Sequence, residues 1–144
     1  MGRYDCLKLE NQLCFPLYAS AREVIKLYRP YLDELNLTYT QYIAMLVCWE
    51  EGCVSVKDMG IRLFLDSGTL TPVLKSLESK GFIIRQRSTK DERVVMVELT
   101  PEGEALRERA LHIPGMMSKH VNLTSEETLT LYRLIYKLLK REDE

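Results

Sequence analysis

The stretch Leu65-Asp66-Ser67-Gly68-Thr69-Leu70-Thr71-Pro72 decides the fold of this chain. Its Asp-Ser-Gly segment supplies turn and helix-cap residues, and apolar residues then recur at helical spacing from Leu70 to Lys80. Upstream, Ser55 and Asp58 form a capping pair that opens a helix over Val56 to Phe64. The sequence therefore predicts two short helices joined by a tight turn.

A β-hairpin is predicted directly after these helices. Gly81 ends the second helix, and the segments Phe82–Arg87 and Val94–Leu99 flank the polar stretch Ser88–Arg93. A helix-turn-helix followed by a hairpin with a basic tip has a physical purpose. The second helix fits the major groove of DNA, while the hairpin reaches phosphates or the neighbouring minor groove.

A long helix is predicted near the N-terminus. Apolar residues recur at helical spacing from Leu9 to Tyr28, and Pro30 is expected to stop the segment. Because proline is tolerated only in the first turn of a helix, Pro16 predicts either a regular helix that begins near Leu13 and Cys14 or a kink there. A short helical piece from Pro30 to Leu35 is expected to follow.

The next segment is apolar nearly all round. Thr38, with Gln41 as its reciprocal capping partner, opens a predicted helix over Tyr39 to Glu51. A helix with this pattern lies at the centre of a small domain. Cys48 is therefore expected to be a core residue.

Two more helices are predicted after the hairpin. Thr100–Glu104 opens the first and Pro114-Gly115 breaks it, whereas Thr124–Glu127 caps the last helix, which ends about Lys140. The predicted fold class is mainly α with a small β-hairpin wing (α+β), a winged helix-turn-helix. We expect a single domain over residues 1–144, with the winged core at about 53–99.

The composition fits a globular protein that works inside the cell. With 46% hydrophobic and 28% charged residues, the chain of 144 residues suits one folded domain. No apolar run reaches the roughly 20 residues of a membrane span, and the opening residues lack the apolar stretch of a signal peptide, so a cytoplasmic protein without a membrane partner is expected. The net charge is −1, but residues 55–99 carry 8 basic and 6 acidic side chains, so the predicted DNA-binding part is the positive one.

Four cysteines, Cys6, Cys14, Cys48 and Cys53, all lie in the first 53 residues. They lack the paired spacing of a zinc ribbon and the density of a disulfide scaffold, and the two histidines form no metal-binding pattern with them. We therefore expect free thiols, no metal site and no cofactor.

The middle of the chain resembles the MarR family of transcriptional repressors. The resemblance rests on Leu65–Pro72, on the Gly-Phe-Ile-x-Arg segment from Gly81, and on Asp91-Glu92-Arg93 at the family's spacing. It implies a repressor that binds a palindromic double-stranded DNA operator. It also implies an intertwined homodimer, with dimerisation helices at about 9–35 and 101–141.

A set of DNA-binding residues follows from the resemblance and from side-chain chemistry. Hydroxyls at the start of the second helix can meet phosphates or base edges, with helix capping as their alternative role. The family match carries over a wing arginine at Arg93, whose guanidinium can enter a minor groove while Asp91 orients it. Further basic residues are candidates for phosphate contact or are simply exposed. The full set is Asp66, Ser67, Thr69, Thr71, Lys75, Arg85, Arg87, Lys90, Asp91 and Arg93.

Within the family, the N-terminal part is similar to OhrR-type regulators, which sense organic hydroperoxides. Leu9–Phe15 carries this likeness, and Cys14 stands where the subgroup keeps its reactive cysteine. Tyr28 and Tyr39 match the two tyrosines that hydrogen-bond to this sulfur from the partner subunit. A thiolate is the nucleophile toward a peroxide, and a helix N-terminus stabilises negative charge. Burial of Cys14 and interface packing of the tyrosines are the alternative roles.

The likeness implies sensing by one cysteine. Oxidation of Cys14 to sulfenic acid breaks the tyrosine hydrogen bonds, and the winged lobes move out of register with the operator. No cysteine follows Cys53, so a small cellular thiol is expected to form a mixed disulfide with Cys14. Cys6 is the alternative reactant. Pro16 replaces the apolar residue expected two positions after the reactive cysteine and bears on the exposure of the sulfur.

Other functions stay open at this point. A MarR-type repressor can instead be released by a non-covalent aromatic ligand in the dimer crevice, and the same residues would serve a broader thiol-based redox regulator of virulence or biofilm genes. An enzyme, such as a thiol peroxidase, is not expected. The chain shows no thioredoxin-like βαβ pattern, no Cys-x-x-Cys motif and no paired catalytic acid and base.

Overall fold

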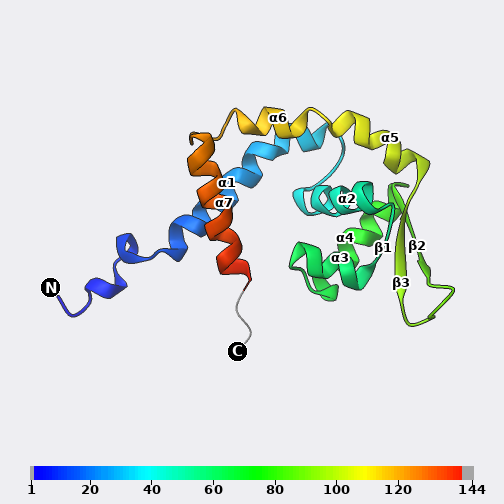
Figure 1. Cartoon of the computed structure of the whole chain (residues 1–144), viewed down its shortest axis with the longest axis horizontal. Helices are drawn as coiled ribbons and strands as arrows, with labels where there is room; N and C mark the ends of the chain where they lie inside the picture. The colour runs from blue at the N-terminus through cyan, green and yellow to red at the C-terminus, as the bar shows by residue number, and fades with distance from the viewer. Residues whose placement is uncertain (1, 141–144) are drawn as a thin grey trace. The chain divides into compact units, whose positions relative to one another are not determined.

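The computed structural model describes residues 2–140, and its contacts divide them into two units. The first unit ends at Ile113 and the second begins at Pro114. In the first unit, two short 3-10 turns, η1 (Asp5–Leu7) and η2 (Leu9–Asn11), precede the helices (Figure 1). The helices of this unit are α1 (Cys14–Asp33), α2 (Tyr39–Glu51), α3 (Val56–Leu63), α4 (Ser67–Ser79) and α5 (Pro101–Ala110).

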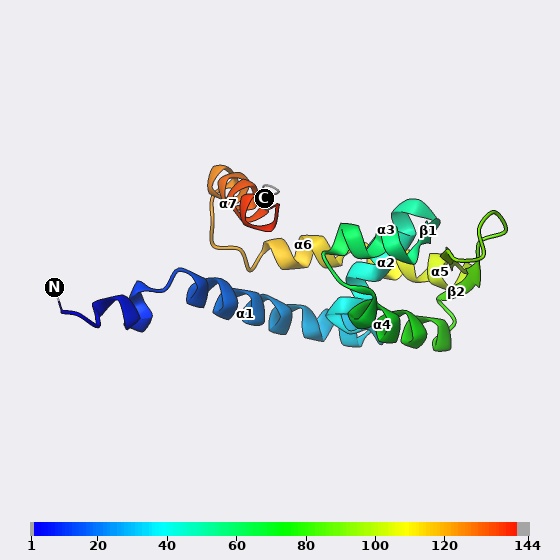
Figure 2. The same ribbon diagram turned by 90° about the horizontal axis from the view of Figure 1, so that it is seen from below.

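Three short antiparallel strands form the sheet of the first unit. They are β1 (Cys53–Ser55), β2 (Ile83–Arg87) and β3 (Val95–Leu99), in the order β1-β3-β2. The pairing of β2 with β3 confirms the predicted hairpin, whose loop projects beyond the helices (Figures 1 and 2). Strand β1 is absent from the sequence prediction because three residues between two helices show no detectable alternation.

The core of the first unit forms around α2, as the apolar pattern of that helix predicts. Cys48 is 1% exposed, and Ala44 and Met45 are fully buried. The α2 helix packs against α1, α3, α4 and α5. At its far end, the Trp49 indole donates a buried hydrogen bond of 2.8 Å to the carbonyl of Gly103 in α5. This bond fixes α5 against the core.

The start of α1 at Cys14 confirms the start predicted from Pro16. The predicted stop at Pro30 is wrong, because α1 continues through Pro30 to Asp33 and takes in most of the separate piece expected there. A proline inside a helix costs about 3 kcal/mol. Leu32 and Leu35 after it are buried, and burial of two leucines contributes about 3–6 kcal/mol. Tertiary packing therefore outweighs the local helix breaker.

Capping residues open the next three helices, and α2 and α3 begin at the predicted places. Thr38 and Gln41 form a reciprocal capping box at the start of α2. At the start of α3, the Ser55 hydroxyl accepts the backbone N–H of Asp58. The α4 helix begins at Ser67, before the predicted start at Leu70. Asp66 is its N-cap, so Ser67 and Gly68, predicted as turn residues, lie inside the helix.

The second unit holds α7 (Ser125–Leu139), while α6 (Ile113–Ser118) begins at the boundary. A capping box at Thr124 and a C-cap at Lys140 confirm the predicted last helix. The predicted break at Pro114-Gly115 is wrong, because α5 already ends at Ala110. Pro114 instead lies in the first turn of α6, where its missing N–H is not needed. Residue 141, the predicted end of the dimerisation helices, lies outside the described residues.

The end helices leave many apolar side chains exposed. They include Phe15, Tyr18, Val24, Ile25 and Leu27 on α1, and Leu129, Leu131, Tyr132, Leu134, Leu138 and Leu139 on α7. None of the helices within residues 2–140 is long and apolar enough to cross a membrane. Large apolar faces of this kind are typical of surfaces that another protein chain covers.

Candidate functional site

The turn between α3 and α4 is fixed by a left-handed residue and a cap. Phe64 ends α3 with a φ of 56°. The Asp66 carboxylate then accepts the backbone N–H of Thr69 at 2.7 Å. Hydrogen bonds from Thr69, from its backbone first and its side chain second, hold the pKa of the Asp66 carboxyl below its ordinary value. Asp66 therefore caps α4 and keeps a negative charge at its start.

The first turn of α4 presents polar groups to solvent. Ser67 and Thr69 are exposed there, as is Lys75 two turns further along the helix. The Thr71 hydroxyl is already engaged, because it donates to the carbonyl of Ser67 at 2.7 Å. The structure therefore brings Asp66, Ser67 and Thr69 together and directs the Thr71 hydroxyl into the helix.

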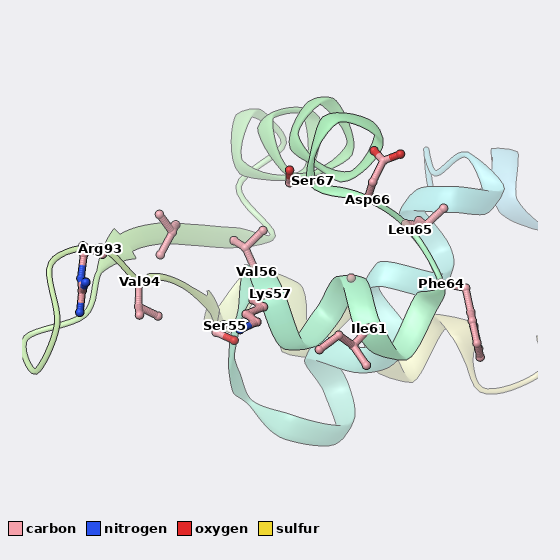
Figure 3. A pocket seen from close by; sticks show the side chains of 12 residues that line it. Ser55, Val56, Lys57, Ile61, Phe64, Leu65, Asp66, Ser67, Arg93 and Val94 are labelled. Carbon is pink, nitrogen blue, oxygen red and sulfur yellow. The ribbon is translucent and has the colours of Figure 1, made fainter. Parts of the chain in front are cut away.

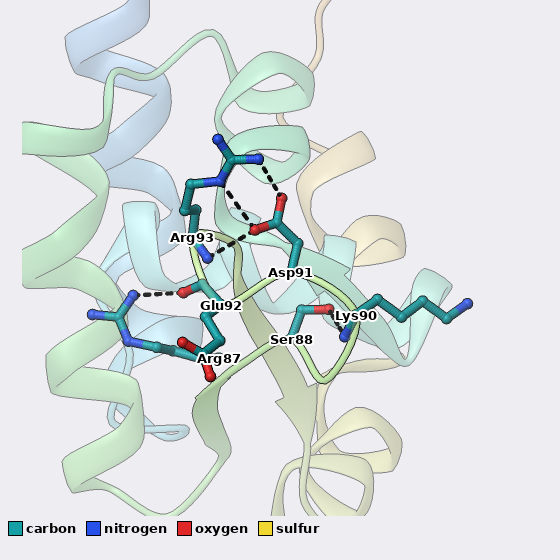
Figure 4. A network of polar contacts seen from close by, with 6 residues as sticks. All are labelled: Arg87, Ser88, Lys90, Asp91, Glu92 and Arg93. Atoms are coloured by element: carbon teal, nitrogen blue, oxygen red, sulfur yellow. Dashed lines mark hydrogen bonds and ion pairs between the residues drawn. The ribbon is translucent and has the colours of Figure 1, made fainter.

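The hairpin loop holds Arg93 in a defined direction (Figure 4). Its guanidinium donates to both carboxylate oxygens of Asp91, at 3.1 Å and 3.3 Å, and its backbone N–H donates to the same carboxylate. These bonds lower the pKa of the Asp91 carboxyl. The Arg93 side chain is nevertheless 91% exposed. The orienting contact expected between Asp91 and Arg93 is thus present, on a side chain that reaches solvent.

The other basic residues of the predicted set divide into two kinds. Arg85 donates from its backbone and its guanidinium to Glu78 near the end of α4, at 2.9 Å and 3.1 Å. Arg87 donates to the carbonyl of Glu92 at 2.9 Å. Lys75 and Lys90 are exposed. The two arginines therefore have partners within the fold, while the two lysines extend from the surface.

A groove of about 960 Å³ lies between α3, the turn after it and the hairpin (Figure 3). It is lined by apolar side chains, including Val56 and Ile61, and by Lys57, Ser67 and Arg93. Sequence reasoning missed Lys57; its place in the first turn of α3 was the available signal. The groove joins the start of α4 and the hairpin arginine in one surface.

Cys14 is the first residue of α1, and its side chain is exposed. The preceding Leu13 supplies no side-chain cap, and Pro16 has no N–H, so this helix starts without the cap that begins α2, α3 and α4. An exposed thiol at a helix N-terminus is accessible to a peroxide, and the helix dipole favours negative charge beside it.

The remaining cysteines are free thiols with different exposure. Cys6 and Cys53 are exposed, whereas Cys48 is buried. Burial raises the pKa of Cys48 to about 12, so that thiol stays protonated and unreactive. Among residues 2–140, no three His, Cys, Asp or Glu side chains gather as metal ligands.

Tyr28 of α1 and Tyr39 of α2 come together in the structure. Their ring centres lie 5.0 Å apart, and the ring of Tyr42 lies 5.7 Å from that of Tyr28. Burial raises the pKa of Tyr28 and Tyr39, so both phenols remain hydrogen-bond donors at neutral pH. Cys14 and Tyr28 are fourteen positions apart on one helix, which is about 21 Å at a rise of about 1.5 Å per residue. A single chain therefore does not bring the thiol to the phenols.

Known proteins resemble this chain over nearly its whole length. The organic hydroperoxide resistance transcriptional regulator of Bacillus subtilis (strain 168) is 50% identical over 139 residues, which cover 96% of this chain and 95% of that protein. Reduced AbfR bound to DNA, a Staphylococcus epidermidis protein, matches with a TM-score of 0.79 at 32% identity, covering 96% of each chain. A mutant MarR from E. coli complexed with operator DNA matches with a TM-score of 0.83 at 26% identity, covering 97% of this chain and 100% of that chain.

The fold and these similarities define a winged helix-turn-helix transcription regulator of the MarR type, a class of regulators rather than enzymes. Residues 26–109 match the family model described as transcriptional regulator SarA/Rot. The chain belongs to this family.

Proposed function

We propose that the protein is a dimeric repressor that binds a palindromic operator and releases it when an organic hydroperoxide oxidises Cys14. The observation that carries the proposal is the exposed thiol at the uncapped start of α1. It occurs in a chain that is 50% identical to a regulator named for organic hydroperoxide resistance. The exposed start of α4 and the oriented Arg93 support the DNA-binding half of the proposal.

In this proposal α4 enters the major groove and the hairpin reaches the minor groove. Ser67 and Thr69 approach base edges or phosphates, Lys75 and Lys90 contact phosphates, and Arg93 enters the minor groove. Relatives of this fold are known bound to DNA, as the AbfR and MarR complexes are. Two α4 helices in a dimer would meet half-sites about 34 Å apart, so a modest rotation removes many contacts.

A second copy of the chain completes the protein. It would cover the exposed apolar faces of α1 and α7, and residues 1–144 would act as one functional domain with the winged core at about 53–99. Since α1 keeps Cys14 about 21 Å from Tyr28 in one chain, the phenols that meet the sulfur belong to the partner subunit.

The switch is a two-electron oxidation of sulfur. The Cys14 thiolate attacks the terminal oxygen of the hydroperoxide, the O–O bond breaks, and the departing alkoxide takes up a proton and leaves as an alcohol. The sulfur keeps one oxygen as sulfenic acid, which displaces the hydrogen bonds from Tyr28 and Tyr39. A small thiol then condenses with the sulfenic acid, and water leaves as the mixed disulfide forms.

The decisive experiment compares wild type with Cys14→Ser for binding to the promoter DNA of their own gene at fixed salt. We expect an organic hydroperoxide to release wild type and the control variant Cys53→Ser, which also lacks one exposed thiol, but not Cys14→Ser. Release of Cys14→Ser by the peroxide would keep the repressor but exclude Cys14 as the sensor and point to another sensing site, such as one of the other exposed thiols. Failure of all three to bind specifically would contradict the repressor itself.

Two further variants test the DNA contact of Arg93 and the identity of the second thiol separately. Arg93→Ala should weaken operator binding roughly 5- to 150-fold, because a specific groove contact of this kind is worth about 1–3 kcal/mol. Mass spectrometry of peroxide-treated Cys6→Ser should show the mixed disulfide of Cys14 unchanged if a small thiol is the partner. Loss of all disulfide in that variant would instead assign the second thiol to Cys6.

A further inference from the structure

Gln41, in the first turn of α2, is a buried polar side chain that makes three hydrogen bonds to other residues. It is 7% exposed. Its Oε1 accepts the backbone N–H of Thr38 at 3.0 Å and the ammonium of Lys80 at 2.9 Å, and its Nε2 donates to the Ser76 hydroxyl at 2.9 Å. Ser76 lies in α4 and Lys80 is its C-cap. One amide therefore joins the start of α2 to the end of α4.

Lys80 extends this network to a third element. Its Nζ also donates to the carbonyl of Asn36, 2.5 Å away, in the loop between α1 and α2. Lys80 is partly buried, which lowers the pKa of its ammonium, and the ammonium donates to both of these acceptors. Hydrogen bonds that involve a charged group are roughly twice as strong as neutral ones.

Tyr39 lies between the two capping residues of this network. Thr38 and Gln41 form the box in which Tyr39 is the first helical residue, so a displacement of the Tyr39 backbone displaces the box. At the other end, Glu78 of α4 accepts the backbone N–H and the guanidinium of Arg85 in β2. The end of α4 is therefore bonded both to the segment that carries Tyr39 and to the hairpin.

We propose that Gln41 and Lys80 are positioning residues. When oxidation of the partner's Cys14 breaks its hydrogen bond to Tyr39, they transmit the change to the orientation of α4 and, through Glu78, to the hairpin. This inference rests on the proposed function. A hydrogen bond of 2.9 Å is lost when its partner moves by about 1 Å, so these bonds add to the side-chain packing of α2 against α4 in holding the two elements together. The start of α2 and the end of α4 therefore move as one body when the phenols lose their contact with the thiolate.

The test replaces the ammonium and keeps the side-chain stem. Full-length Lys80→Met is compared with wild type for the ratio of operator Kd values in the oxidised and reduced forms, and mass spectrometry records Cys14 oxidation in both. Coupling between sites commonly reaches about 100-fold, so we expect a wild-type ratio of that order and a ratio under about 10 in Lys80→Met. Cys14 oxidation should be unchanged. Lys8→Met, which removes an exposed ammonium paired with Asp5 outside the predicted dimerisation helices and the DNA-binding set, is the control and should keep the wild-type ratio.

Two other variants guard against a trivial loss of folding. Lys80→Arg retains the charge and the donors and should restore most of the ratio, while Ser76→Ala removes one bond of Gln41 and should give an intermediate ratio. If Lys80→Met weakens operator binding of the oxidised and of the reduced protein by the same factor, the coupling role is overturned and the proposed function stays intact. If oxidised wild type itself keeps its operator affinity, the proposed function fails first.

Discussion

The middle of the chain and its two end helices differ in how far one chain can complete them. Around α2, Met45 and Leu74 are buried to within 1% exposure, and every buried side-chain N or O atom in the described residues has a partner. On the end helices, Tyr18 of α1 and Tyr132 of α7 remain 59% and 63% exposed. The winged helix-turn-helix part is therefore fully packed within one chain, whereas the end helices keep exposed apolar faces, which the proposed second chain would cover.

The largest expected effect is on the free energy of unfolding, when alanine replaces Gly103 and, for comparison, Gly115. A Cβ at Gly103 would overlap the carbonyl oxygen of Phe82 and lie 2.8 Å from the Leu99 side chain, so Gly103→Ala must move backbone. Its free energy of unfolding, measured in urea, should fall by about 3 kcal/mol. A Cβ at Gly115 in α6 meets nothing within 4 Å, so Gly115→Ala should gain up to about 1 kcal/mol. Equal effects at both positions would show that Gly103, packed against the core, is no more constrained than Gly115 in α6.

The next prediction tests the exposed apolar face of α7. Leu134 of α7 is 45% exposed, and Leu134→Asp places a charge where we expect a second chain. The dissociation constant of the dimer should rise by about 30- to 150-fold, or about 2–3 kcal/mol, in sedimentation equilibrium. Ile61→Asp alters a side chain that is 64% exposed on α3, in the winged core, and should leave the dimer intact. Dissociation by Ile61→Asp alone would move the interface to the winged core.

A smaller effect concerns the missing cap of α1. Gln12 is the last residue with extended backbone before the helix, so Gln12→Ser offers a hydroxyl to the free N–H groups of the first turn. Gln12→Ala loses the same side-chain hydrogen bonds without adding a cap and is the control. At one fixed protein concentration, the thermal midpoints should show Gln12→Ser to be more stable than Gln12→Ala by about 0.5–1 kcal/mol. Equal midpoints would show that the serine does not cap α1.

The smallest expected effect is on how the thermal midpoint depends on pH. The pKa of Asp66 is lowered on folding, so its charged form stabilises the protein above the ordinary value of 3.8, and this stability is lost as the pH falls through the lowered pKa. Asp66→Asn keeps a cap that does not titrate. Its thermal midpoint should lie about 1–3 °C below wild type at pH 7 and should equal it near pH 2. A difference that persists at pH 2 would assign it to packing.

Local signals in the sequence predict this fold well, while contacts over long separations escape them. Thr38, Asp66 and Thr124 cap the helices that they precede, because a cap bonds to a group three residues away. At Pro30 the local rule fails, since Leu32 and Leu35 directly after it are buried against the rest of the fold, and this packing decides where the helix ends. The site shows the same division. The pairing of Arg93 with Asp91 follows from two-residue spacing, but that of Lys80 with Gln41 depends on the packing of α4 against α2.

The length of α1 has a genetic consequence. Because one chain holds Cys14 and Tyr28 about 21 Å apart, each sensor of the proposed dimer takes its sulfur from one gene product and its phenols from the other. A Cys14→Ser subunit still offers tyrosines, and a Tyr28→Phe subunit still offers a thiol. A mixed dimer then regains one intact sensor, although each variant alone has none. Peroxide should therefore release the operator from purified mixed dimers although it releases neither homodimer, and in a cell that makes both subunits the homodimers would keep part of the operator bound.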